Sequence, residues 1–273
     1  MPDTVYNARP ALHAPRAFLR DAAGDLHQAI PLARHLFSGD LRARHRRAWL
    51  GYAWLLLPPL AGVGLCVLIQ SKRIVDVPAT ELPYPLFVLS GVVLWQIFTE
   101  ALLSPVGQLS GARRMLRGQR VPHEAFILAG VLDLALNAAV RLALLGVALL
   151  LFAAPVWSWV LVPVAAVVLA ALGLALGLFA TPLGLLYDDV RRGLQLLASF
   201  GLFVSPVLYP VPAAGAFALN PARVPLDMVR AWLVSPVPAS TAFLLTAVLA
   251  GAGLALAWLF YRLARPHVLA RQG

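Results

Sequence analysis

Six apolar runs, each about as long as a bilayer is thick, limit what this chain can fold into. An α-helix needs about 20 consecutive apolar residues to cross the hydrocarbon core of a membrane. Backbone polar groups must be satisfied within the segment there, so helices are the expected form of each run. The sequence therefore predicts an all-α, polytopic membrane protein with six transmembrane helices. These runs lie near residues 49–70, 85–106, 125–152, 156–182, 194–212 and 239–261.

Charge composition supports the membrane class. Only 12% of the residues are charged and 60% are hydrophobic, whereas about 25% of the residues of a soluble domain are charged. The net charge of +10 could suggest a nucleic-acid partner. However, the basic residues lie almost wholly between the apolar runs, where they set topology. We therefore expect membrane lipids, and no nucleic acid, among the partners.

The distribution of Lys and Arg predicts the orientation. Seventeen of the 22 lie in 1–48, 107–124, 183–193 and 262–273, and the alternate loops carry four. By the positive-inside rule both termini are cytoplasmic, in a multi-pass protein of the bacterial inner membrane.

Four segments are predicted along the chain. They are a disordered cytoplasmic tail (1–24), an amphipathic interfacial helix (25–48), a six-helix transmembrane domain (49–265) and a cytoplasmic tail (266–273).

The segment before the first run has the period of an amphipathic helix. Its apolar residues share one helical face, and arginines lie around or after it. Such a helix would lie on the anionic cytoplasmic leaflet; a basic linker beside the membrane is the alternative. The apolar positions are Leu26, Ile30, Ala33, Phe37 and Leu41.

Enzymatic motifs are absent from the sequence. A P-loop needs glycines before a Gly-Lys-Ser/Thr triplet, but the one lysine, Lys72, follows Gln70 and Ser71. All six histidines lie outside the apolar runs, and neither His-Glu-x-x-His nor Gly-x-Ser-x-Gly occurs. The lone Cys66 excludes an internal disulfide and a multi-cysteine metal site. We expect a transport component with no catalytic residue, no metal site and no ATPase motif of its own.

Polar residues within the runs are candidate functional residues, because charges in a membrane are costly and usually face inward or pair. Asp133, Asn137 and Arg141 are spaced i, i+4, i+8 on one face. They form either a polar stripe along a translocation path or a relay within one helix, in which Asn137 bridges the two charges. Pairing lowers the cost of insertion, so the relay is favoured.

The second run carries another polar face. Gln96, Glu100 and Ser104 align there, beside Trp95 and Phe98. Aromatic faces stack on sugars, while amides and carboxylates bond hydroxyl groups, so a sugar path fits. Contacts between helices explain the pattern equally well. In the fourth run, Gly173 and Gly177 form a small-xxx-small pair that predicts close helix packing.

Three segments together resemble the permease subunits of polysaccharide-exporting ABC transporters, the class that exports O-antigen, capsule and teichoic acid precursors. They are 39–47 running into 50–54 and Pro59, then 84–91 with 95–98, and 186–191 with 205–210 and Asn220-Pro221. Asp188 stands where that family usually has arginine, and Gly39 also replaces a usual arginine.

The resemblance implies a homodimer on two ABC ATPase subunits. Re-entrant helices are expected in the last external loop, 211–238, and a channel at the dimer interface. The substrate implied is an undecaprenyl-pyrophosphate-linked glycan, with O-antigen first and capsule or teichoic acid as alternatives. ATP and Mg would be bound by the partner, and no cofactor by this chain. A self-sufficient channel or secondary carrier is the other class, but it would be expected to show inverted repeats, and none is seen.

Two groups of residues are candidates for these roles. The channel would be lined by Tyr52, Trp54, Trp95, Gln96, Phe98 and Glu100. Coupling to the ATPase would use two cytoplasmic loops, through Arg113, Arg114 and Arg117 and through Tyr187, Asp188, Asp189, Val190 and Arg191. Asp188 and Asp189 oppose the positive-inside trend, so topology does not explain them, whereas a complementary interface does.

Overall fold

The computed structural model describes residues 15–47, 53–72, 81–112, 115, 121–210 and 220–272. Every regular element in these ranges is a helix, which confirms the all-α class. The helices are α1 (Pro15–Arg47), α2 (Ala53–Ser71), α3 (Tyr84–Gly111), α5 (His123–Leu151), α6 (Ser158–Leu186), α7 (Asp188–Val204), α8 (Arg223–Val234) and α9 (Thr241–Gln272).

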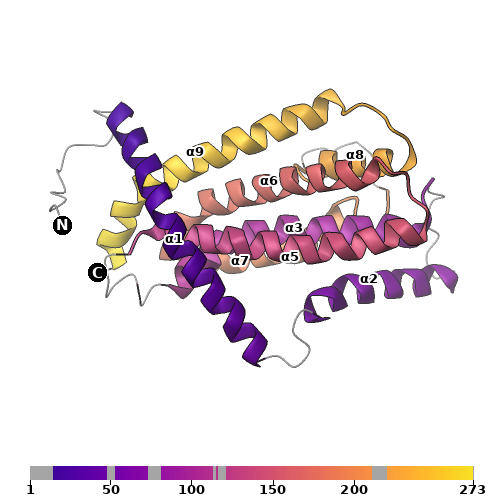
Figure 1. Ribbon diagram of the computed structural model, residues 1–273, viewed down its shortest axis with the longest axis horizontal. Coiled ribbons are helices and arrows are strands. Elements are labelled where there is room, and N and C mark those ends of the chain that lie inside the picture. The colour runs from indigo at the N-terminus through magenta and orange to yellow at the C-terminus, as the bar shows by residue number, and fades with distance from the viewer. Residues whose placement is uncertain are drawn as a thin grey trace.

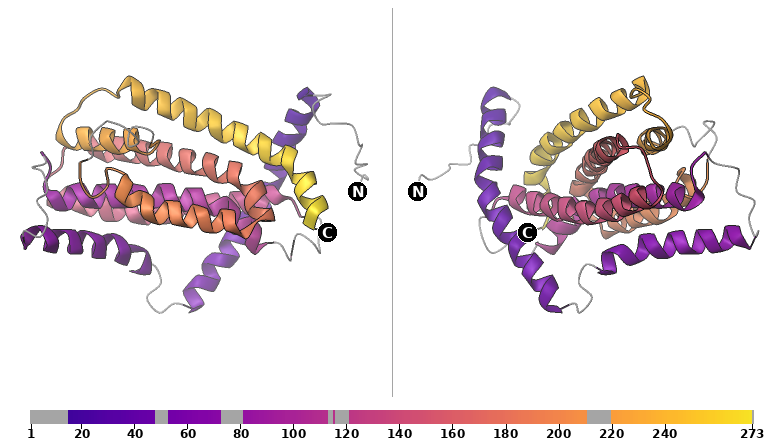
Figure 2. Two further views of the ribbon diagram at one scale, coloured as in Figure 1. Left: turned by 180° about the vertical axis from the view of Figure 1, so that it is seen from behind. Right: turned by 45° about the vertical axis from the view of Figure 1, so that its right-hand side comes forward.

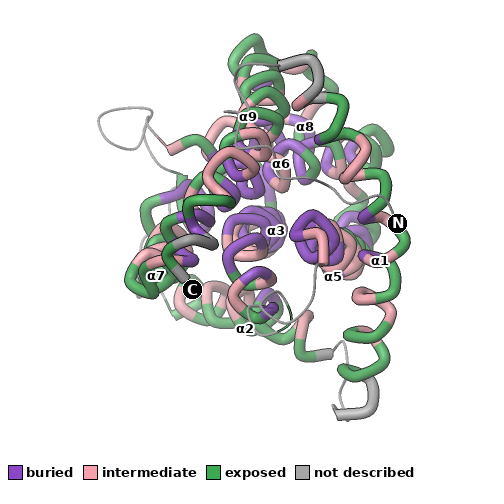
Figure 3. The backbone as a smooth tube through the Cα atoms, turned by 90° about the vertical axis from the view of Figure 1, so that its left-hand side faces the viewer, coloured by how far each residue is buried: buried purple, intermediate pink, exposed green. Residues whose placement is uncertain are grey.

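The bundle is built around α3. Viewed along its length, α3 lies in the middle, with α2, α5, α6 and α7 around it and α8 and α9 beyond α6 (Figure 3). We call one end of the bundle the terminal end, because α9 finishes there and α1 lies across it (Figure 1). At the opposite end, the loop end, lie α8 and the turn between α5 and α6 (Figure 1).

Within the described residues, five helices are long and apolar enough to cross a membrane: α2, α3, α5, α6 and α9. The remaining predicted run, 194–212, lies partly in α7, which has 17 residues and begins with charged side chains. The helix ends at Val204, because the residue before Pro206 is disfavoured in the α conformation. The structure therefore supports five of the six predicted spans.

Helix α1 is longer than the sequence suggested. It begins at Pro15, so the helix extends into the segment predicted as a tail; residues 1–14 lie outside the described part. Pro31 is accommodated inside it. All five predicted apolar positions are buried or half-buried, and α1 runs across the other helices (Figure 2). At the other terminus α9 continues to Gln272, through most of the predicted tail 266–273.

Glycines bring α3 and α6 into close contact. A Cβ atom added at Gly173 would meet the Phe98 carbonyl oxygen, and one added at Gly177 would meet that of Leu102. Small residues let two backbones approach in this way inside a membrane. The small-xxx-small pair therefore serves helix packing, as predicted.

One helix of the predicted re-entrant loop is described. Helix α8 buries Leu226, Val229 and Trp232. The Trp157 indole donates a hydrogen bond to the Trp232 carbonyl oxygen (2.8 Å). Residues 211–219 lie outside the described part, and re-entry of α8 into a membrane stays a prediction.

The Asn220-Pro221 motif has a clear local role at the start of this helix. The Asn220 amide donates to the Ser205 hydroxyl (2.6 Å), just beyond the end of α7. Its carbonyl oxygen accepts from the Ala222 backbone N–H (3.0 Å). One side chain thus ties the end of α7 to the start of α8.

We predict that Gly177→Val destabilises the protein by about 1–3 kcal/mol, the usual cost of overpacking, because valine would force α3 from α6. Gly251→Val is the matched control, since a Cβ atom there meets nothing within 4 Å. Thermal unfolding of the detergent-solubilised variants gives the comparison. Equal melting temperatures for the two variants would contradict the role assigned to Gly177.

Candidate functional site

A carboxylate on α3 organises the polar side chains of α5. Glu100 accepts a hydrogen bond from the Asn137 amide (2.5 Å) and forms an ion pair with the Arg141 guanidinium. The side chain of Arg141 is 10% exposed and that of Glu100 is 23% exposed. Charge-assisted bonds of this kind are about twice as strong as neutral ones, so the cluster holds α3 to α5 within the span.

Asp133 has a different partner. Its two carboxylate oxygens accept hydrogen bonds of 2.7 Å each from the Arg44 guanidinium of α1. The hydrogen bond that Arg44 donates to Asp133 is the largest cause that raises the pKa of Arg44. The relay predicted within α5 is therefore wrong, because Asn137 and Arg141 bond to Glu100 while Asp133 bonds to α1.

The four charges are balanced and lie on three helices. Arg44 and Asp133 connect α1 to α5, and Glu100 and Arg141 connect α5 to α3. Two polar atoms in this region, Gln96 Oε1 and Arg141 Nε, are buried and have no hydrogen-bond partner among the described residues. The predicted membrane polar residues thus come together, but across helices rather than along one.

The aromatic channel candidates differ in their surroundings. Trp95 and Phe98 are buried, with ring centroids 5.3 Å apart. The Trp95 indole donates to the Ala198 carbonyl oxygen of α7 (3.0 Å), and Gly201 of α7 lies against its ring. The Trp95 ring therefore holds α7 on α3. By contrast Trp54 is 60% exposed on α2, and Tyr52 lies outside the described residues.

A second charged cluster lies at the terminal end, where α9, α5 and α1 meet. Glu124 is only 1% exposed and lies 3.4 Å from both Arg262 and Arg265 of α9. Arg262 also bonds Asp25 of α1 (2.7 Å). Sequence reasoning missed this cluster; the available signal was a carboxylate in the first turn of a span and two arginines at i, i+3 spacing at the end of another.

The same end buries a pair of ring side chains. The Tyr261 hydroxyl lies 2.7 Å from His123 Nδ1, and both side chains are buried. The pair joins the start of α5 to α9 beside Glu124.

The predicted coupling residues of the second loop form an exposed corner between α6 and α7. Tyr187 ends α6 in an extended conformation, and Asp188 and Asp189 open α7. Asp189 and Arg192 form a long, exposed ion pair (3.4 Å), and exposed pairs contribute little stability. Val190 is half-buried and Arg191 is exposed. Arg113, Arg114 and Arg117 of the other loop lie outside the described residues.

Comparison with known proteins gives one informative relative. No protein-family model matches the chain. Over 189 residues, which are 68% of this chain and 71% of the relative, the chain is 26% identical to the O-antigen export system permease protein RfbA of Myxococcus xanthus. The chain resembles a polysaccharide-exporter permease. This confirms the resemblance found in its three motif segments, and it fits a multi-pass membrane protein that is similar to a transport component.

The charge pairs predict a specific pattern of couplings. Arg141→Leu alone should cost about 3 kcal/mol, because it leaves the half-buried Glu100 carboxylate without its cation. The double change Glu100→Leu with Arg141→Leu should cost less than Arg141→Leu alone. Thermal unfolding of the purified single and double variants measures the coupling energy.

The matched control combines Arg141→Leu with Asp133→Leu. Each of these residues has its own partner on a different helix, so the two losses should add. A coupling between Asp133 and Arg141 larger than that between Glu100 and Arg141 would reject the pairing seen here.

Proposed function

We propose that this chain is the membrane-spanning subunit of an ABC exporter that moves a lipid-linked polysaccharide across the bacterial inner membrane. The observation that carries the proposal is the similarity to the O-antigen export permease over two thirds of the chain. The five candidate spans support it. O-antigen on undecaprenyl pyrophosphate is the proposed substrate, and capsule or teichoic acid precursors are alternatives within the same class.

ATP hydrolysis belongs to a separate subunit in this proposal, because the sequence has no P-loop. The terminal end faces the cytoplasm, where the positive-inside rule places the basic segments. The exposed arginines of α1, such as Arg20, Arg34 and Arg42, then lie against the anionic leaflet. The same end presents its loops to two ATPase subunits.

The proposed assembly contains two copies of the chain. Helix α7 buries none of its residues, although Leu197, Phe200 and Phe203 are large and apolar. Helix α2 is the least buried of the five candidate spans. These two helices flank α3 (Figure 3). A second copy packed along them would form a path next to the exposed Trp54.

The corner between α6 and α7 is suited to transmit movement. Asp188 and Asp189 lie at its exposed tip, and further along α7 the backbone at Ala198 and Gly201 contacts Trp95 of α3. Helix α3 also carries Glu100, which holds α5 through Asn137 and Arg141. A displacement of the corner by an ATPase would therefore reach α3 and then α5.

The function is tested by deleting the gene in its native host. Surface polysaccharide should disappear while lipid-linked glycan accumulates inside the cell, and re-expression should restore export. The purified complex should contain two copies of this chain and two of an ATPase whose P-loop lysine is essential for export. Unchanged surface polysaccharide in the deletion strain would reject the proposal.

The coupling role predicts that Asp189→Arg uncouples ATP hydrolysis from export. Complementary charges fix the register of two proteins across an interface. A reversed charge at the exposed tip would therefore repel the ATPase surface that Asp189 attracts. We expect export to fall at least about tenfold, equivalent to about 1.4 kcal/mol of lost coupling, while the complex stays folded. Hydrolysis and glycan transfer are measured together in proteoliposomes.

Two controls separate coupling from local stability. Arg192→Gln breaks the same ion pair without reversing a charge, and it should leave export near normal. Asp189→Asn keeps the side-chain size but removes the negative charge at the start of α7. Its unfolding shows how much that charge stabilises the helix, for which about 0.3–1 kcal/mol is typical. Normal export by Asp189→Arg would remove this corner from the coupling path.

A further inference from the structure

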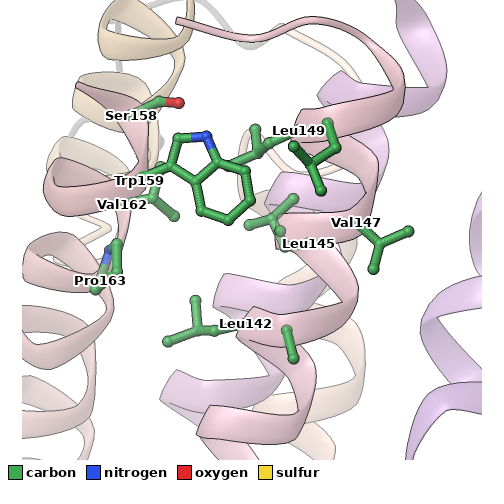
Figure 4. A pocket seen from close by; sticks show the side chains of 11 residues that line it. Leu142, Leu145, Val147, Leu149, Ser158, Trp159, Val162 and Pro163 are labelled. Atoms are coloured by element: carbon green, nitrogen blue, oxygen red, sulfur yellow. The ribbon is translucent and has the colours of Figure 1, made fainter. Parts of the chain in front are cut away.

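An apolar groove separates α5 from α6 at the loop end. It encloses a cavity of about 350 Å³, and Figure 4 shows side chains of both helices around it. Aliphatic residues of α5 and the start of α6 form its walls. The lining includes Leu142, Ala143, Leu145, Gly146 and Leu149 of α5 and the Trp159 ring of α6.

The groove follows from side-chain size along two neighbouring helices. Ala143 and Gly146 leave the surface of α5 hollow at two positions one turn apart. On α6 the Trp159 ring lies over Gly146, where an added Cβ atom would come within 3.4 Å of it. The polar Ser158 side chain at the rim is already bonded to the Pro155 carbonyl oxygen (2.6 Å). The walls therefore offer almost nothing for water to bind, and buried water needs polar partners.

The surroundings indicate what fills the groove. Both helices are candidate membrane spans, and two apolar residues that line the groove are exposed, Val147 to 54% and Leu150 to 67%. In a bilayer these residues contact hydrocarbon. The groove is therefore continuous with lipid chains rather than with water.

Trp159 marks the depth of the groove. Tryptophan is enriched at the headgroup level of membranes, and Trp159 is the second residue of α6, next to the turn. Its ring nitrogen points toward the turn, and its six-membered ring points toward Leu145 and Leu149 (Figure 4). No described residue accepts a hydrogen bond from this nitrogen. The groove thus has an amphipathic rim at interface depth and apolar walls below it.

We propose that this groove binds one acyl chain of a bilayer phospholipid, with Trp159 beside the headgroup. The attraction is shape-dependent dispersion rather than the hydrophobic effect, because lipid tails are as apolar as leucine. Leu145 and then Leu142 follow one another along the groove, away from the rim (Figure 4). An extended acyl chain that enters at the rim can therefore lie along both side chains. The proposal requires only that α5 and α6 span a membrane, so it stands apart from the proposed export function.

The test uses the full chain in nanodiscs that contain a phospholipid with a diazirine in its acyl chain. After illumination, peptides covering 142–150 and 158–163 should carry several-fold more label than the equally exposed surface of α6 around Val167. Ala143→Trp should fill the groove and abolish this enrichment. Ala135→Trp is the matched control, since Ala135 is also exposed on α5 but lies outside the groove.

Ala143→Leu provides a milder variant, and its unfolding temperature shows whether the fold is kept. Even labelling along α5 and α6, or enrichment that survives both changes at Ala143, would overturn the proposal. A polyprenyl phosphate probe with the diazirine in its chain, enriched where the phospholipid probe is not, would overturn it as well, because the occupant would then be an isoprenoid.

Discussion

Close backbone contact between α3 and α6 determines where the polar chemistry of this protein lies. Without side chains at Gly173 and Gly177, the carbonyl groups of Phe98 and Leu102 pack directly on α6. That contact places α3 in the middle of the bundle, and it turns Glu100 toward α5 and Trp95 toward α7. One helix can therefore hold a buried charge on one side and an amphipathic helix on another.

Periodicity in the sequence was sufficient to predict most of the helices, but not which helices pack against each other. Hydropathy and length identified five spans that the structure supports, because a bilayer imposes both on any crossing helix. The i, i+4, i+8 spacing correctly placed Asp133, Asn137 and Arg141 on one face. It could not show that α1 and α3 both pack against α5, so it favoured a relay within the helix. Partner choice depends on which helices pack together, and a single-helix pattern carries no such information.

Helix α7 shows the second limit of pattern reasoning. Its apolar residues, together with those that follow the Ser205-Pro206 pair, were predicted as a span because only hydropathy was counted. The charges that open it, Asp188 to Arg192, shorten the apolar part, and the helix ends before Pro206. The Glu124 cluster was missed for a related reason. Its arginines follow the apolar run of α9, where basic residues are expected from topology alone, and the burial of their common partner appears only in three dimensions.

The two ion pairs of α1 have a geometric consequence. Asp25 bonds Arg262 of α9 and Arg44 bonds Asp133 of α5, and 19 residues of helix separate these anchor points by about 28 Å. A rigid rod anchored to two different helices works as a spacer of fixed length. Helices α5 and α9 can change their separation at the terminal end only if one anchor opens. Both anchors are partly exposed to solvent, so dissolved salt weakens them, and the ionic strength beside the membrane sets how firmly the rod is held.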